Sequence, residues 1–380
     1  MATRSSNITL NPTRRRVLAA PIILWAVILT PSLLGASIIA PLVNQWHEKS
    51  LYQFKGKSVP LKNEFYGIQM LDRICADIAA VFGLLQFHEE SHYYWHSLDF
   101  LAQYGAVYGI LMLESSKKGY RSRLLLRTIA VITLSQCTNS GLLLPIYFYF
   151  LHTSSNLKSL KHESASLEQN SASALAVLPT VALAFYAPHF GSFLDPDFAA
   201  RHWWNWLWQP FPVWGTILFF VFSGLFTMLP KLQGVLPAFL AKRIKLHSRL
   251  KATRLTAVYI GMINIGTYWC VLGVSGHSWW DIYVPKHFLQ PAKNPQAALG
   301  TIMQFDYIAI FGSAITWLVY QFVELKAAGL LRMSWARILL VGFGVAVVFG
   351  PGALCWVGWM AREEVLASSR AWQGERSKTK

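Results

Sequence analysis

The chain has 380 residues, of which 54% are hydrophobic and only 14% are charged, and its mean hydropathy is +0.35. A soluble domain is nearer a quarter charged, so this composition excludes an ordinary soluble enzyme and favours a membrane protein. The net charge of +16 does not indicate nucleic-acid binding, because Lys and Arg stand in short clusters between apolar runs, as at residues 14–16 and 242–245. Such clusters are typical of segments that border anionic lipid headgroups. The four cysteines lie within apolar segments, which indicates buried thiols and no disulfide framework.

The first half of the chain alternates between apolar and polar segments. A basic tail at residues 1–16 precedes an apolar run at 17–43, which is too long for a signal peptide and predicts an uncleaved first span bent at Pro21 or Pro31. Residues 44–64 are polar, and further spans are predicted at 67–87 and 98–113. The apolar run at 124–151 is interrupted by a polar stretch at 135–141 and by Pro145, so it crosses the membrane either once or twice.

The second half begins with a polar linker at 154–170 and continues with spans at 172–190, 212–229, 252–274, 300–323 and 338–360. The tryptophan-rich stretch at 203–208 is too short to span and suits the interface or a re-entrant turn. The pattern predicts an all-α, polytopic transmembrane bundle of eight or nine spans. It forms one domain at residues 17–362, with a charged tail at 363–380. The orientation is left open, and Asn7-Ile8-Thr9 is a glycosylation sequon only if the N-terminus is lumenal.

The span at 300–323 contains one ionisable residue, Asp306. A charged carboxylate near the middle of a bilayer costs roughly 2.5–3.5 kcal/mol on insertion scales, so an intramembrane acid is a functional candidate by default. At helical spacing, small and polar side chains form one stripe with this acid on an otherwise apolar helix: Asp306, Ala309, Ser313, Thr316 and Tyr320. Such a stripe faces protein or a cavity. The competing interpretation is a packing helix whose acid bonds a neighbour.

Residues 88–92 read His-Glu-Glu-Ser-His and match the H-E-x-x-H pattern of zinc proteases. On a helix, His88 and His92 would share one face with Glu89 beside them. An intramembrane zinc protease is therefore an alternative function. The motif nevertheless sits in a short connector, and a third ligand would have to come from elsewhere, such as Asp195. The alternative without catalysis is an interfacial loop in which these side chains are solvated. We expect this alternative, and therefore no metal.

Other acids compete for a role. Asp72 lies on a small-and-polar face of the span at 67–87, whereas Asp77 is four residues from Arg73 and is expected to pair with it. A diphosphate-binding Asp cluster would favour a prenyltransferase, but no D-D-x-x-D motif is present. Glu114 lies at the end of the third span, just before a basic run. It is either a catalytic acid or a partner in a salt bridge at the membrane boundary. Glu324 is expected to be a solvated boundary charge.

A series of short motifs follows in order along most of the chain. They are Leu71-Asp72, the Glu-Ser and basic turn at 114–119, Leu-Pro-Ile-Tyr at 144–147, Leu178-Pro179 with Tyr186 and Pro188, Trp-Gln-Pro-Phe-Pro-Val-Trp at 208–214, and Gln-Phe-Asp-Tyr at 304–307. This order resembles the fungal membrane-bound terpene cyclases of the ascofuranone and paxilline type. The H-E-x-x-H stretch is not part of the resemblance.

The resemblance implies protonation of an epoxide, or of an alkene, on a prenylated aromatic or indole substrate and cyclisation of the resulting cation. Opening an epoxide to a cation needs a general acid, and burial in apolar surroundings keeps a carboxyl protonated. We expect Asp306 to be this acid, Asp72 its partner acid or base, and Glu114 a third candidate. We expect the substrate cavity to be lined by Tyr147, Tyr186, Trp208, Trp214 and Ser313.

The chemistry needs no cofactor. The expected partners are the prenylated substrate, membrane lipid, and a membrane epoxidase and prenyltransferase of the same pathway in the endoplasmic reticulum. A proton-coupled transporter that uses the same acids as a relay is the non-enzymatic alternative.

Overall fold

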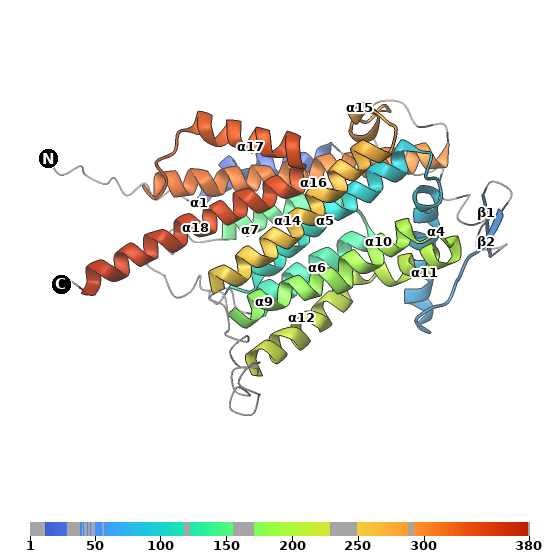
Figure 1. Cartoon of the computed structure of the whole chain (residues 1–380), viewed down its shortest axis with the longest axis horizontal. Helices are drawn as coiled ribbons and strands as arrows, with labels where there is room; N and C mark the ends of the chain where they lie inside the picture. The colour runs from blue at the N-terminus through green and yellow to red at the C-terminus, as the bar shows by residue number, and fades with distance from the viewer. Residues whose placement is uncertain are drawn as a thin grey trace.

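The computed structural model describes residues 12–28, 50–54, 57–117, 122–154, 171–228, 249–287 and 294–378, together with positions 39, 41, 44, 46 and 292. The described part is all-α apart from one small hairpin (Figure 1). In the first half the elements are α1 (Pro12–Ala19), α2 (Pro21–Val27), β1 (Leu51–Phe54), β2 (Lys57–Pro60), α4 (Gln69–Gln86), α5 (His92–Ser115), α6 (Ser122–Cys137) and α7 (Ser140–Ser154).

In the second half, α9 (Ser171–Val181) continues through a π-helical turn, η2 (Ala182–Tyr186), into α10 (Ala187–Leu194). The remaining helices are α11 (Phe198–Trp208), α12 (Phe211–Met228), α14 (Arg249–Val274), α15 (Trp279–Tyr283), α16 (Pro295–Ala327), α17 (Trp335–Phe349) and α18 (Pro351–Lys378). Helix α1 and the C-terminal part of α18 lie at one end of the bundle, and α4, α11 and the β-hairpin lie at the other (Figure 1). We call these the terminal end and the hairpin end.

Helix α5 forms the centre of the bundle. It begins at the cap Ser91, whose side chain accepts the N–H of Tyr93, and nearly every residue from Ser97 to Ser115 is buried. A helix that is apolar on all faces needs neighbours on all faces. Here they include α14, α18, α16 and α9.

Four described stretches are long and apolar enough to cross a membrane: Ala172–Leu194, Phe211–Met228, Leu250–Val274 and Pro295–Ala327. A membrane location is therefore consistent with the structure, but the expected eight or nine spans are not supported. The segment at 67–87 forms α4, which runs across the hairpin end at a steep angle to the bundle helices (Figure 1). The segment at 17–43 is described only in part.

Two predicted spans are broken helices. The run at 124–151 is two short helices, α6 and α7, and a 2.5 Å hydroxyl contact between Thr128 and Tyr147 shows that they fold back on each other. The predicted span at 338–360 is wrong, because the chain turns at Gly350 (φ +85°) between α17 and α18. The turn is held inside the bundle, where the N–H of Gly352 donates to Gln103 Oε1 at 2.9 Å. Irregular backbone is tolerated at membrane depth where protein satisfies it in this way.

The hairpin end contains structure that the sequence patterns did not predict. Leu51–Phe54 and Lys57–Pro60 form the antiparallel pair β1–β2, with Tyr52 opposite Val59. The tryptophan-rich stretch is a regular helix, α11, capped by Asp197 and packed against α4 and α10. Trp206 is fully buried, whereas Trp203 is half exposed.

Candidate active site

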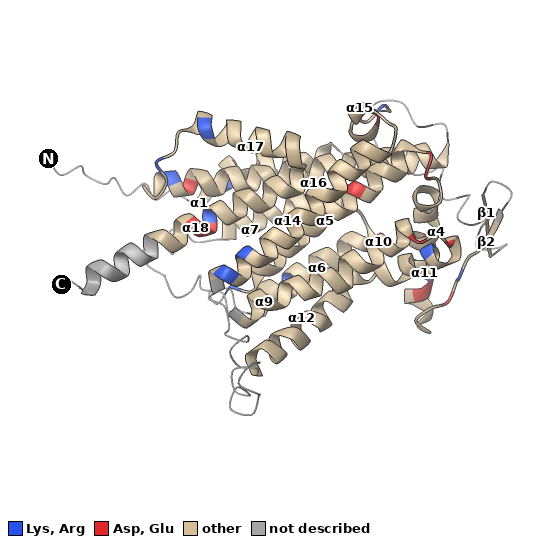
Figure 2. Ribbon diagram, viewed as in Figure 1, with Lys and Arg blue, Asp and Glu red and all other residues tan. Residues whose placement is uncertain are grey.

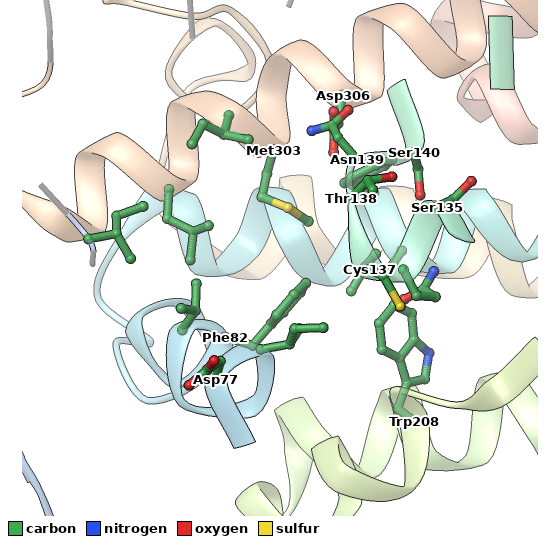
Figure 3. Close-up of a pocket in the computed structure, with 18 of the residues that line it drawn as sticks. Asp77, Phe82, Ser135, Cys137, Thr138, Asn139, Ser140, Trp208, Met303 and Asp306 are labelled. Atoms are coloured by element: carbon green, nitrogen blue, oxygen red, sulfur yellow. The ribbon is translucent and has the colours of Figure 1, made fainter. Parts of the chain in front are cut away.

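A cavity of about 450 Å³ lies between α4, α5, the α6–α7 turn, α11 and α16 (Figure 3). One wall is apolar and aromatic, and the α6–α7 turn supplies a polar wall. The apolar wall includes Ile78, Val81, Phe82, Phe100, Leu101, Trp208, Leu299, Ile302 and Met303. The polar wall includes Ser135, Gln136, Cys137, Thr138, Asn139, Ser140 and Asp306. This volume is within the range of cavities that hold small-molecule ligands.

Asp306 projects into this cavity from α16 and is only 7% exposed. Its Oδ1 atom is buried and has no hydrogen-bond partner of standard geometry among the described residues. The side chain of Asn139 lies beside its carboxyl (Figure 3). The backbone N–H of Gly141 also faces the carboxyl. A buried polar atom without such a partner costs free energy, and this one lies on a residue that lines the cavity.

The α6–α7 turn is built to approach this acid closely. Asn139 caps α7 by accepting the N–H of Leu142 at 3.0 Å, which turns the first N–H groups of α7 toward α16. A Cβ atom on Gly141 would lie 2.7 Å from Asp306 Oδ1 and 3.1 Å from the Cβ of Ala309. Only glycine fits here. The N-terminus of a helix carries partial positive charge, so α7 favours negative charge on the Asp306 carboxyl.

Two further polar side chains line the cavity and were not predicted. Tyr104 reaches it from α5 and lies beside Ser140 and Asp306. Asp77 reaches it from α4, where it is partly exposed and far from Asp306 across the cavity (Figure 3). The interruption at 135–141 in an apolar run was the available signal for the polar wall, and it was interpreted only as a possible break.

Of the residues expected to line the cavity, Trp208 does so together with Asp306. Tyr147, Tyr186, Trp214 and Ser313 are not in its lining. Tyr186 donates to the carbonyl of Ala102 at 3.1 Å. Ser313 donates to the carbonyl of Ile310 at 2.9 Å, one turn back on its own helix. A role for these four in substrate contact remains a prediction.

Asp72 lies in the first turn of α4, outside the cavity lining. Its Oδ1 accepts the N–H groups of Phe65 at 3.1 Å and Tyr66 at 2.7 Å. Burial alone would raise the pKa of this carboxyl, but backbone N–H donors of the preceding turn outweigh it and hold the pKa below its usual value. The side chain therefore shapes the turn that leads into α4.

Glu114 lies near the terminal end, in a buried cluster of charges. Its Oε2 accepts from Lys117 at 2.5 Å and from the Trp359 indole at 3.0 Å. Lys117 also donates to Glu363 at 2.9 Å, and Arg362 donates to Glu363 at 2.6 Å. Two acids and two bases thus compensate each other, which matches the boundary salt bridge expected as the alternative for Glu114.

A second buried pair involves Glu324. It is 8% exposed and bonds Arg15 at 2.5 Å, so the expectation of a solvated charge was wrong.

Sequence patterns also missed Asp99, a fully buried acid on α5. Its two oxygens accept from Gln103 at 3.1 Å and from the Tyr283 hydroxyl at 2.8 Å. Asp99 is not in the cavity lining, and its two partners come from α5 and α15. It is a satisfied buried acid, in contrast to Asp306.

The H-E-x-x-H residues do not lie on one helix. His88 to Ser91 form the connector before α5, and only His92 is helical. His88 Nε2 contacts the Tyr52 hydroxyl at 3.0 Å, and Glu89 pairs with Arg201. Among the described residues no group of three or more His, Cys, Asp or Glu side chains has a metal-binding arrangement.

Comparison with known proteins gives a family match over most of the chain. Residues 22–367 match the CtvD domain family. Two similar fungal proteins are "FAD-dependent monooxygenase verC1" of Penicillium polonicum, 25% identical over 82% of this chain, and "FAD-dependent monooxygenase anuJ" of Penicillium roqueforti (strain FM164), 24% identical over 92% of this chain.

The matches cover 38% and 42% of those two proteins, so the chain spans about two fifths of the length of the curated relatives that it matches. No solved structure matches. The family match extends from α2 to α18 and includes every wall of the cavity around Asp306. The chain belongs to the CtvD domain family.

Proposed function

We propose that this protein is an integral membrane cyclase that protonates an epoxide on a prenylated aromatic or indole substrate and closes rings from the resulting cation. The observation that carries the proposal is Asp306, a buried carboxyl with an unpartnered oxygen on the wall of a largely apolar cavity. Acid-initiated cyclisation needs one protonated acid, aromatic walls and exclusion of water.

The first step is proton transfer from Asp306 to the epoxide oxygen. An O–H bond forms, the C–O bond to the more substituted carbon breaks, and the positive charge develops on that carbon. The step begins from the neutral form of the carboxyl. After the step the carboxylate faces Asn139 and the N-terminus of α7, where donors and the helix dipole stabilise it.

The second step is ring closure. A substrate alkene attacks the cationic carbon, a C–C bond forms, and the charge moves along the chain. The rings of Phe82, Phe100 and Trp208 line the cavity. An aromatic face stabilises a nearby desolvated cation by about 2 kcal/mol or more. Loss of a proton to a base, or capture by a hydroxyl, ends the sequence. The hydroxyls of Tyr104 and Ser140 border the same space as Asp306.

The printed names of the relatives raise the question whether this chain holds FAD. Dinucleotide sites place the pyrophosphate at a helix N-terminus after a parallel strand and a glycine-rich turn. In the described part of the chain the strands are β1 and β2, which form an antiparallel hairpin. These residues do not fit FAD. We therefore assign no flavin step to this chain, and propose that a separate flavin monooxygenase supplies the epoxide after a prenyltransferase has attached the chain.

The test is a product assay in microsomes from a host that expresses the protein. Candidate prenylated substrates are supplied both as epoxides and as the parent alkenes, and products are separated by liquid chromatography and mass spectrometry. Cyclisation gives an isomer with the mass of the epoxide, whereas capture by water adds one water. We expect an isomer from the epoxide and nothing from the alkene.

A folded protein that converts no epoxide would contradict the proposal. Proton-coupled uptake of the same compounds into vesicles, without any product, would support the transporter alternative. Microsomes that lack the protein serve as the control.

A further inference from the structure

The two ends of the bundle differ in the charge that they expose (Figure 2). At the terminal end the exposed or partly exposed charged side chains are almost all basic. In the described part of the chain they are Arg16, Arg127, Lys251, Arg254, Lys326, Arg332 and Arg337, against one acid, Glu364. That acid is bonded to Arg254 at 2.5 Å.

The hairpin end has the opposite balance. Its exposed or partly exposed acids in the described chain are Glu64, Asp77, Glu89, Glu90, Asp195, Asp197 and Asp281. Among the side chains whose exposure is described, the bases there are Lys62, Arg73 and Lys286. Lys286 is bonded to Asp281 at 2.5 Å, so even part of this smaller positive charge is locally compensated.

Contacts fix the terminal end as one surface. Arg15 of α1 bonds Glu324 near the end of α16, and Lys117, two residues beyond the end of α5, bonds Glu363 of α18. Arg254, in the second turn of α14, bonds Glu364 of α18. The start of α14, the ends of α5 and α16 and the C-terminal part of α18 therefore lie at one end of the bundle, where α1 also packs.

Exposed tryptophan side chains gather at the hairpin end. Trp203 of α11 and Trp279 and Trp280 of α15 are 50%, 44% and 69% exposed. Large exposed indoles are typical of the headgroup level of a membrane, where the ring contacts lipid and its N–H contacts water. The β1–β2 hairpin packs next to α11 at this same end.

We propose that the terminal end is the cytoplasmic face, held against anionic headgroups of the cytoplasmic leaflet, and that the cavity lies on the lumenal side of the bundle. The excess of Lys and Arg on one side decides the orientation of a membrane protein, and acids contribute little to it. Anionic lipids of the cytoplasmic leaflet attract the same residues. Both chain termini are then cytosolic. Asp306 and Asp77 are reached from the lumenal half of the membrane, because the cavity lies between α16 and the crossing helix α4. This inference concerns orientation and does not depend on the proposed reaction.

Two single substitutions give a matched test. Gly56→Asn completes an N-x-S sequon with Ser58 in the β1–β2 connection, at the hairpin end. Ser377→Asn completes an N-x-T sequon with Thr379 in the C-terminal tail, at the terminal end. The native sequon at Asn7 serves as an internal reference. Each protein is expressed in a host cell and microsomes are isolated from it. The electrophoretic mobility of the protein is compared before and after treatment with endoglycosidase.

We expect Gly56→Asn to gain an endoglycosidase-sensitive glycan, and the wild type and Ser377→Asn to remain unmodified. A glycan on the wild type or on Ser377→Asn overturns the proposal. A C-terminal epitope tag gives a second, independent readout. Antibody should reach the tag when only the plasma membrane is permeabilised, whatever the glycosylation efficiency at position 56. A tag that is detected only after the internal membranes are dissolved overturns the proposal. Neither the glycosylation assay nor the antibody assay depends on cyclase activity, so a failure of the proposed reaction would not change their results.

Discussion

Replacing Asp306 by Asn tests the proposed proton donor directly. The substitution keeps the shape of the side chain and removes its transferable proton. A general acid contributes about 10²–10⁴-fold to a rate. A loss of that size corresponds to about 2.7–5.5 kcal/mol of transition-state free energy. We expect the rate of isomer formation to fall by this factor.

The structure also predicts that the fold survives this change. Asp306 Oδ1 has no hydrogen-bond partner of standard geometry in the described chain, so the substitution breaks no such bond at that atom. The amide fits the space between α16 and Gly141 because it has the volume of the carboxyl. We therefore expect unchanged accumulation and an unchanged thermal midpoint in detergent.

The assay compares initial rates of isomer formation at equal amounts of folded protein, with kcat and KM measured separately. Loss of a proton donor lowers kcat and leaves KM nearly constant. Turnover retained within threefold would remove Asp306 from the chemistry. A parallel loss of folded protein would instead assign Asp306 a structural role.

Four further changes test the surroundings of the cavity. Gly141→Ala places a methyl group 2.7 Å from Asp306 Oδ1, so we expect about 1–3 kcal/mol of destabilisation by thermal unfolding and at least tenfold lower activity; unchanged values would show that the α6–α7 turn relaxes freely. Asp99→Asn leaves one of two buried donors unpaired, so stability should fall by about 1–3 kcal/mol while turnover per folded molecule is kept. Asp72 has a lowered pKa in the folded state, so its contribution to stability is present above its ordinary pKa of about 3.9 and is lost as the pH falls below it. Asp72→Asn should therefore flatten the acid limb of the unfolding profile and keep activity at pH 7; a loss of kcat would restore Asp72 as a catalytic group. EDTA should leave the rate unchanged, and a loss that zinc reverses would favour the motif at His88 and His92.

Sequence patterns predicted the helical class and the apolar segments because both depend on local hydrophobicity. They overestimated the number of spans for a physical reason. Hydrophobicity along a segment does not distinguish a helix exposed to lipid from one buried in protein, as α5 shows, or from one that crosses the end of a bundle, as α4 shows. It also did not register the fold-back at Gly350, where a glycine with positive φ and the following proline end one helix and begin another.

The acidic residues show that the neighbours of a side chain on its own helix do not predict whether it lines the cavity. Asp77 was set aside because Arg73 lies four residues away, and Asp72 was preferred for the small side chains on its own face. The structure places Asp77 in the cavity lining and Asp72 in the first turn of α4, where its carboxylate accepts backbone N–H groups of the preceding turn. Glu114 and Glu324 have partners that are distant in sequence: Trp359 and Arg362 for Glu114, and Arg15 for Glu324. Such partners are invisible to any pattern of local spacing.

Asp306 differs from the other buried acids because the hydrogen bonding of its carboxyl oxygens is incomplete. Asp99, Glu114 and Glu324 each accept hydrogen bonds from side chains that hold them in place. Removing a partner from such a group costs the desolvation penalty of the group left behind, which is a structural effect. Asp306 borders the cavity, so a substrate oxygen has room to approach its carboxyl. It also faces the first turn of α7, which would stabilise the carboxylate that proton transfer leaves behind. A buried acid in the bundle is common to several positions of this chain, whereas an incompletely paired acid on a cavity wall is the arrangement that proton transfer to a bound substrate requires.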